Sequence, residues 1–187
     1  MEERISLSLV QALSAIWSAI RKRHSDVPGV VLLPAPNPHR QTNVLGHFAP
    51  LRWSPKQENG RRWHEVIVVA EHLDRSARDV LETLLHEAAH ALNFDRGIKD
   101  CSANQYHNRQ FRAAATELGL EVQQVPNYGF AATSLPAETG DLYYDEICSL
   151  EMVLIHRQQL QVDTRSPPTP TGTAGSSPVK SRSRSLK

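Results

Sequence analysis

The sequence predicts a small α+β domain, and three observations support this class. Apolar residues recur with helical spacing near the N-terminus, β-branched residues fill the strand-like run Trp63–Ala70, and a capped amphipathic helix begins after Ser76. With 187 residues, 40% of them hydrophobic, the chain is long enough for one domain with a genuine core. We expect an N-terminal amphipathic helix within residues 1–25, a single domain over residues 26–162 and a tail over residues 163–187.

The first predicted helix covers residues 4–24. A secretory signal is a poorer interpretation of this stretch, because Glu2 and Glu3 precede it and Arg21 to Arg23 follow it. No apolar run approaches the length of a membrane span, so we expect no membrane partner. The apolar side chains of the helix are spaced three or four positions apart, as on one helix face; they are Ile5, Leu9, Leu13, Ile16 and Ile20.

Three strand-like segments precede the central helix. The short apolar run Val30–Leu33 lies among prolines, and Val44–Trp53 is a second candidate. Trp63–Ala70 is the strongest, since its β-branched residues are typical of a mostly buried strand. We therefore expect a short sheet of about three strands.

The central helix has a clear start. Ser76 and Asp79 fit a capping box, and the helical pattern continues to about Asn93 or Phe94. One broad arc of this helix is apolar and is expected to face the core; it holds Val80, Leu81, Leu84, Leu85, Ala88, Ala91 and Leu92.

The other arc of this helix carries the motif His86-Glu87-Ala88-Ala89-His90. Histidines four positions apart are offset by about 40° around a helix and about 6 Å along it, so both imidazoles can reach one metal ion. A catalytic zinc ion usually has three protein ligands and a water, and Glu87 is placed to accept a proton from that water. No lysine or arginine lies between Arg78 and Arg96, which is unlike a solvated face. The pattern predicts a zinc site.

A third ligand is expected from the next helix, which the pattern places over residues 106–119. His107 shares a face with Phe111 there, and this face is predicted to point toward the core and the central helix. Glu117 and Glu121 are alternative acidic ligands, although Glu117 lies off this face and Glu121 follows the helix end. The remaining histidines lack ligand spacing and are interpreted as packing or surface residues; they are His24, His39, His47, His64, His72 and His156.

Two further elements and a tail complete the prediction. Leu120–Val125 alternates as a short strand does, and Asp141–Gln159 has a helical pattern. Beyond Asp163 the composition changes to Pro, Thr, Ser and Gly, which cannot bury enough apolar area to offset the entropy of ordering, so we expect disorder. The residues expected on the inner face of the last helix are Ile147, Leu150, Met152, Leu154 and Ile155.

Charge is divided unevenly between domain and tail. Residues 1–164 hold 16 Lys and Arg against 20 Asp and Glu, whereas the residues after them hold five basic residues and no acidic ones. The domain is therefore not a typical basic nucleic-acid-binding surface, and the tail is the visible candidate for weak, salt-dependent DNA binding. Two cysteines, Cys101 and Cys148, are too few for a disulfide framework or a four-cysteine zinc module, which favours a reduced, cytoplasmic location.

The segment from Leu84 to Phe111 resembles the SprT-like zinc metalloprotease domain family, which includes the Spartan DNA–protein crosslink proteases. The resemblance rests on His86-Glu87-Ala88-Ala89-His90 followed by His107-Asn108-Arg109-Gln110-Phe111, and it covers roughly residues 60–160. It implies a small zincin-like fold, in which the short sheet packs on the central helix and on a second, ligand-bearing helix. It also implies a Zn²⁺ ion held by His86, His90 and His107, with Glu87 as general base.

The chain departs from the pattern of this family at two points. Many members carry a C-terminal zinc ribbon with paired Cys-x-x-Cys motifs, and this chain has no such pair. Asn108 stands where glycine is common. Without the ribbon, DNA binding does not carry over from the resemblance.

The expected function is zinc-dependent hydrolysis of peptide bonds by a zinc-activated water, with DNA-associated proteins as one class of substrate. One alternative is a non-proteolytic zinc-containing module that binds DNA or a protein partner, and another is a peptidase dedicated to one regulatory protein. The protein substrate and the oligomeric state stay open. So does the residue that stabilises the oxyanion, for which the candidates are Tyr106, Tyr128, Tyr143 and Tyr144.

Overall fold

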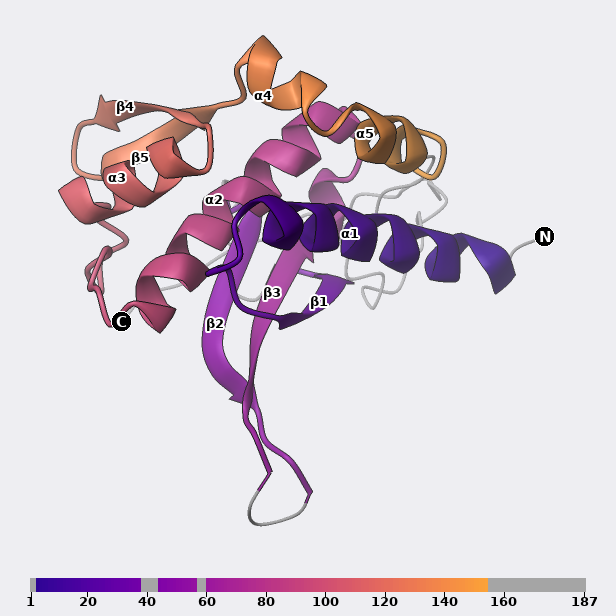
Figure 1. The fold of residues 1–187 in the computed structure, drawn as a ribbon, viewed down its shortest axis with the longest axis horizontal. Coiled ribbons are helices and arrows are strands. Elements are labelled where there is room, and N and C mark those ends of the chain that lie inside the picture. The colour runs from indigo at the N-terminus through magenta and orange to yellow at the C-terminus, as the bar shows by residue number, and fades with distance from the viewer. Residues whose placement is uncertain (1–2, 38–43, 57–59, 155–187) are drawn as a thin grey trace, which may run out of the picture.

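The computed structural model describes residues 3–37, 44–56 and 60–154. The fold is a mixed α+β domain with two sheets, as predicted for the class. In Figure 1, helix α1 crosses α2 and runs beside α5, while α3, β4 and β5 gather at the other side of α2. The elements are α1 (Glu3–Arg23), β1 (Val30–Ala35), β2 (Gly46–Trp53), β3 (Trp63–Val69), the 3₁₀ turn η1 (Ala70–His72), α2 (Ala77–Asp95), α3 (Arg109–Glu117), β4 (Glu121–Val125), β5 (Gly129–Ser134), α4 (Ala137–Asp141) and α5 (Tyr144–Glu151).

The first sheet has the order β1-β3-β2, so β3 is its central strand. β1 runs parallel to β3 and β2 runs antiparallel to it, which sets Leu32 beside Val66 and Gly46 beside Val68. Val66 and Val68 are fully buried, because side chains of a central strand that face a helix layer are shielded from water. The prediction of about three strands ahead of α2 is confirmed.

Helix α2 begins as the sequence indicates. The Ser76 hydroxyl accepts a hydrogen bond from the Asp79 amide, and the Asp79 carboxylate accepts one from the Ser76 amide, both at 3.2 Å. This capping box satisfies two backbone donors that a helix start otherwise leaves unpaired. The helix ends at Asp95, just beyond the predicted end, and its predicted apolar arc is fully buried.

Helix α1 covers one side of α2 with the apolar face that its spacing predicts. Leu13, Ile16 and Ile20 are fully buried. Trp17 is buried with them, and its indole N–H donates to the Pro28 carbonyl at 3.0 Å. This bond fixes the connection between α1 and β1, since a buried indole N–H requires an acceptor. None of the helices in the described ranges combines the length and apolar character needed to cross a bilayer.

The second predicted helix starts later than expected. It was expected over residues 106–119, but α3 begins at Arg109, with Asn108 as its N-cap. His107 therefore lies in the connection ahead of the helix, where it forms β-bridges with Cys101 and Gly129. The later start is explained by the Asn108 side chain, which accepts hydrogen bonds from the first helical amides. An N-cap residue has extended backbone angles itself, so the helix begins at the next residue. The expectation of a ligand-bearing helix is wrong in this detail.

The C-terminal elements also differ from the prediction. The strand expected at Leu120–Val125 is present as β4, but it pairs with a second strand, β5, that was not predicted. Within the single helix expected over Asp141–Gln159, the structure has the shorter α5, which ends at Glu151, while α4 ends at Asp141, where the expected helix begins. Met152 was expected on the inner face and is 75% exposed, whereas Leu150 is fully buried as expected. Residues 155–159 and the tail over residues 163–187 lie outside the described residues.

Candidate metal centre and cleft

Three imidazoles from two segments meet at one point. His86 and His90 lie one turn apart on α2, and His107 reaches them from the connection ahead of α3. Their candidate ligand atoms all lie within 4.8 Å of one another. Nε2 of His90 is 3.2 Å from Nε2 of His107. The structure thus brings together the three histidines that the sequence predicts as ligands.

The ring of Phe111 packs against all three imidazoles. Phe111 comes from α3, it is fully buried, and the centroid of its ring lies 4.6 Å from that of His86, 4.7 Å from that of His90 and 4.5 Å from that of His107. Apolar packing on one side and the cleft on the other leave the imidazoles little freedom to turn. The prediction that His107 lies on the same side as Phe111 is correct, although His107 is not helical.

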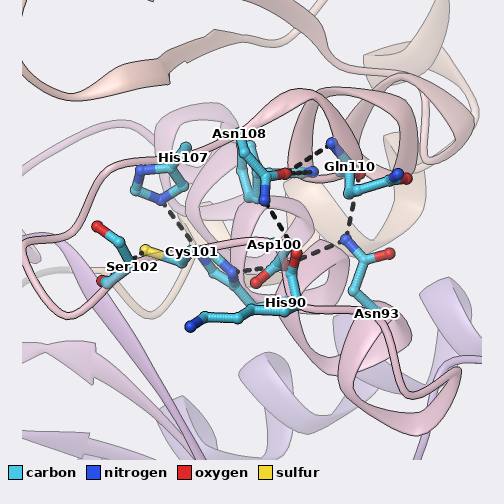
Figure 2. A network of polar contacts seen from close by, with 10 residues as sticks. His90, Asn93, Asp100, Cys101, Ser102, His107, Asn108 and Gln110 are labelled. Carbon is cyan, nitrogen blue, oxygen red and sulfur yellow. Dashed lines mark hydrogen bonds and ion pairs between the residues drawn. The ribbon is translucent and has the colours of Figure 1, made fainter.

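Outer hydrogen bonds set the ring orientation of both α2 histidines. Nδ1 of His90 lies 2.9 Å from the Asp100 carboxylate, as Figure 2 shows. Nδ1 of His86 lies 3.5 Å from the Thr133 hydroxyl, which itself donates to Glu82 at 2.9 Å. Acceptors at Nδ1 assign the proton of each ring to that atom and leave the Nε2 lone pair directed at the common point.

The lowered pKa values of His86 and His107 suit a metal ion. Burial lowers the pKa of His86 well below its ordinary value, and the neighbouring His90 and His107 lower it further. The pKa of His107 falls to about 4, first through burial and then through His90. Neutral imidazole is the form that ligates zinc. Two ligands held about 2 Å from a tetrahedral ion lie about 3.3 Å apart, which agrees with the separation of the His90 and His107 Nε2 atoms. The residues present therefore fit a metal ion.

Glu87 lies next to this cluster and is buried. Its side chain is 6% exposed, and its carboxylate accepts the backbone N–H of Phe48 on β2. Burial raises its pKa from 4.5 to about 7, while His90 and the Phe48 amide oppose that rise. A carboxyl group with a pKa near neutrality can both take up and release a proton at physiological pH.

Gly46 allows β2 to approach α2 at this point. A Cβ atom on Gly46 would lie 2.7 Å from the Thr83 Cγ2 atom and 2.8 Å from a Glu87 carboxylate oxygen. Both distances are too short for a side chain to fit. The absence of a side chain at Gly46 is therefore what sets the edge of β2 against Glu87.

A cleft of about 1530 Å³ opens above the cluster. One wall is β2 with the residues just before it, and the opposite wall is the β4–β5 hairpin, including Val125, Tyr128 and Thr133. His86, Glu87 and His90 line it from α2, and His107 lines it from the loop. The volume accommodates several residues of an extended peptide.

The alternative acidic ligands do not join this site. Glu117 accepts two hydrogen bonds from Arg96, at 2.7 and 2.8 Å. Glu121 is exposed on β4. Within the ranges that the structure describes, the three histidines form the only cluster of His, Cys, Asp or Glu side chains that could hold a metal ion. Of the candidate oxyanion donors, Tyr128 lines the cleft, whereas Tyr143 is buried beneath the Arg23 guanidinium.

Sequence reasoning did not identify the outer partners Asp100, Asn93 and Thr133. Asn93 carried a usable signal, because it is a polar residue one turn after His90 on a helix that is otherwise buried there. Asp100 and Thr133 carried none, since each comes from a separate connection or strand and meets its histidine only in the folded chain. Long-range contacts of this kind leave no periodic trace in a sequence.

Comparison with known proteins agrees with this geometry. The model of the SprT-like family matches residues 10–132, which is more than half of the chain and includes all three histidines and Glu87. No curated protein and no solved structure gives a significant match. A match that runs from α1 to β5 covers the three-stranded sheet, α2, the His107 loop and α3. The chain belongs to the SprT-like family, a family of metallopeptidase-type domains.

Proposed function

We propose that this protein is a zinc-dependent metallopeptidase that hydrolyses peptide bonds, with His86, His90 and His107 as metal ligands and Glu87 as general base. The observation that carries the proposal is the convergence of three imidazoles beside the buried Glu87 carboxyl group, whose pKa is raised to about 7. A structural metal site does not require a general base, whereas a hydrolytic site does. Membership of the SprT-like family supports the same conclusion.

Zinc is the metal that a set of three imidazoles favours. When bound, it supplies a Lewis acid that lowers the pKa of a water molecule and polarises a carbonyl group. His86, His90 and His107 would hold the metal through Nε2. The Nδ1 atoms of His90 and His86 contact Asp100 and Thr133, and these contacts keep those two rings from turning.

Glu87 moves the proton in this proposal. Its carboxylate receives a proton from the attacking water and then delivers it to the leaving amine, so the residue ends the reaction in its starting state. The Phe48 amide that donates to the carboxylate fixes its orientation. Burial among β2 and α2 keeps bulk water from competing for that proton.

The substrate is expected to bind as an extended strand beside β2. Among the described strands β2 pairs with β3 alone, and its other edge faces the cleft. An extended peptide can add to such an edge through main-chain hydrogen bonds. The cleft walls carry Val44, Leu45, Phe48, Val125 and Ala131, which favours apolar side chains near the scissile bond. DNA-associated proteins are the proposed source of such segments, on the resemblance to the Spartan proteases.

The test combines metal content with cleavage of an unstructured protein substrate, with and without single-stranded DNA. Glu87→Gln is expected to keep stoichiometric zinc and to lose about 10²- to 10⁴-fold in cleavage rate, whereas His107→Ala is expected to lose zinc. Glu138→Gln, an exposed carboxylate on α4, is the matched control and should behave as wild type. An active Glu87→Gln protein would defeat the mechanism.

A further inference from the structure

We propose that Asp100, Asn93 and Asn108 form a positioning network that fixes the imidazole of His90 and ties the His107 loop to α2, so that these two ligands are ordered before a metal ion arrives. The inference rests on the proposed function, because the side chains that the network positions are the proposed metal ligands. None of the three residues is one of the proposed ligands, so they act on the metal through the histidines.

The first link joins Asp100 to His90. The carboxylate and Nδ1 are 2.9 Å apart, and the two side chains are only 13% and 15% exposed. An anionic acceptor at Nδ1 requires the proton to be there, which commits Nε2 to act as a ligand. A buried charge-assisted bond of this length also holds the ring plane.

The second link holds the carboxylate itself. The Asn93 side-chain amide donates to the Asp100 carboxylate at 3.1 Å and lies 3.3 Å from the Gln110 carbonyl, as Figure 2 shows. Asn93 is 2% exposed and stands one turn after His90 on α2. Its amide therefore bridges α2, the Asp100 loop and the first turn of α3 through one buried group.

The third link is Asn108, which stands next to His107. Its side-chain oxygen accepts from the Gln110 amide at 2.7 Å and from the Phe111 amide at 3.3 Å, and so caps α3. Its side-chain amide donates to the Lys99 carbonyl at 2.9 Å, and its backbone N–H donates to the Asp100 carbonyl at 2.9 Å. Asn108 thus connects the loop that carries Asp100 to the start of α3, directly beside His107.

This arrangement gives Asn108 a role that a glycine at the same position could not fill. Glycine retains the backbone bond to Asp100, but it has neither the oxygen that caps α3 nor the amide that reaches Lys99. The departure from the family pattern is therefore coupled to the loop that presents Asp100. If these residues only stabilised the fold, their substitution would lower stability and leave metal affinity unchanged. A positioning role predicts that metal affinity falls as well.

The experiment measures Zn²⁺ affinity of the full-length chain by competition with a chromophoric chelator, beside thermal unfolding of the metal-free protein. Asp100→Asn removes the anionic acceptor and is expected to weaken Zn²⁺ binding about 10- to 100-fold. Asp100→Glu should recover part of this loss. Asp26→Asn is the matched control, because Asp26 is an exposed carboxylate paired with Arg96 away from the site.

Asn108→Ser provides a second, milder variant. Serine can still cap α3 but is too short to reach the Lys99 carbonyl, so we expect about 10-fold weaker Zn²⁺ binding with unchanged helicity. It also covers the case in which Asp100→Asn fails to fold. Bound Co²⁺ reports ligand geometry independently of cleavage, and its visible spectrum should change in Asp100→Asn and not in Asp26→Asn.

The outcomes separate this inference from the proposed function. Wild-type affinity in folded Asp100→Asn and Asn108→Ser would overturn the network and leave the peptidase intact. A wild-type protein that binds zinc tightly but cleaves nothing would overturn the peptidase, and weaker binding by the two variants would still support the network.

Discussion

The two histidines of α2 and the histidine ahead of α3 reach the same point by different routes. His86 and His90 are held by a single continuous helix, whose geometry sets their spacing whatever surrounds it. His107 is held by β-bridges to Cys101 and Gly129, by its neighbour Asn108 and by contact with Phe111. A site assembled in this way has one component fixed by local structure and one that depends on tertiary packing.

This contrast indicates which substitutions should affect the metal site and which should affect the whole fold. Changes that weaken α2 as a helix should reduce the stability of the whole domain and leave the metal site intact in the folded fraction. Changes that loosen the contacts of His107 should act on the metal site more than on the rest of the fold. Three experiments, in order of expected effect, separate these two kinds of change.

The largest effect is expected from Phe111→Ala. The substitution removes the ring that packs against all three imidazoles. Truncating a fully buried phenylalanine typically lowers the free energy of unfolding by about 3–5 kcal/mol. Urea unfolding measures this loss, and chelator competition measures Zn²⁺ affinity in the folded protein. We expect both to fall.

Leu150→Ala is the matched control for this variant. Leu150 is also fully buried, but it lies on α5, outside the histidine cluster. Its truncation should destabilise the protein by a similar order, about 2–5 kcal/mol, and leave Zn²⁺ affinity unchanged. Equal losses of Zn²⁺ affinity in the two variants would show that Phe111 affects the metal site only through the stability of the fold.

An intermediate effect is expected from pH acting on Glu87. Its pKa is raised from 4.5 in the unfolded chain to about 7 in the folded protein, so the stabilisation it contributes is complete below pH 4.5 and is lost as pH rises through 7. The loss is on the order of 3 kcal/mol. Unfolding of the metal-free wild type and of Glu87→Gln should be compared from about pH 4.5 to pH 8.

The comparison with Glu87→Gln isolates this residue. The lowered pKa values of His86 and His107 act in the opposite direction, since the folded protein favours their neutral forms, and this contribution is present in both proteins. The wild type should therefore lose stability relative to Glu87→Gln as pH rises from 4.5 through 7. A difference that stays constant over this range would mean that Glu87 is not buried against β2.

The smallest effect is expected from Ser76→Ala, which tests the local component. Loss of the N-cap costs about 1 kcal/mol of stability, measured by urea unfolding. Zn²⁺ affinity should not change, because the cap lies at the N-terminus of α2, ten residues before His86. Ser14→Ala, at an exposed position within α1, is the control and should change stability by less. A fall in Zn²⁺ affinity in Ser76→Ala would contradict the separation of the two components.

Much of the fold was predictable where the signal is local. The capping box of Ser76 and Asp79, the apolar arc of α2 and the β-branched run of β3 depend on residues close together in the chain. The start of α3, the separate helix α4 and the short length of α5 were not predicted. A side-chain cap at Asn108 and the end of α5 at Glu151 interrupt patterns that look continuous in the sequence. The pairing of β4 with β5 was also missed.

The sequence alone places two histidines of α2 on one face, with Glu87 beside the first of them, because the period of a helix converts a spacing of four residues into a shared direction. It also identified His107, though by assigning it to a helix that begins two residues later. The surroundings of these groups depend on the tertiary structure. Asp100 on His90, Phe48 on Glu87 and Phe111 beneath the rings come from separate segments, and burial against them sets the pKa of Glu87 and the ring orientation of His90. These properties depend on solvent exclusion and long-range contacts, which exist only once the chain has folded.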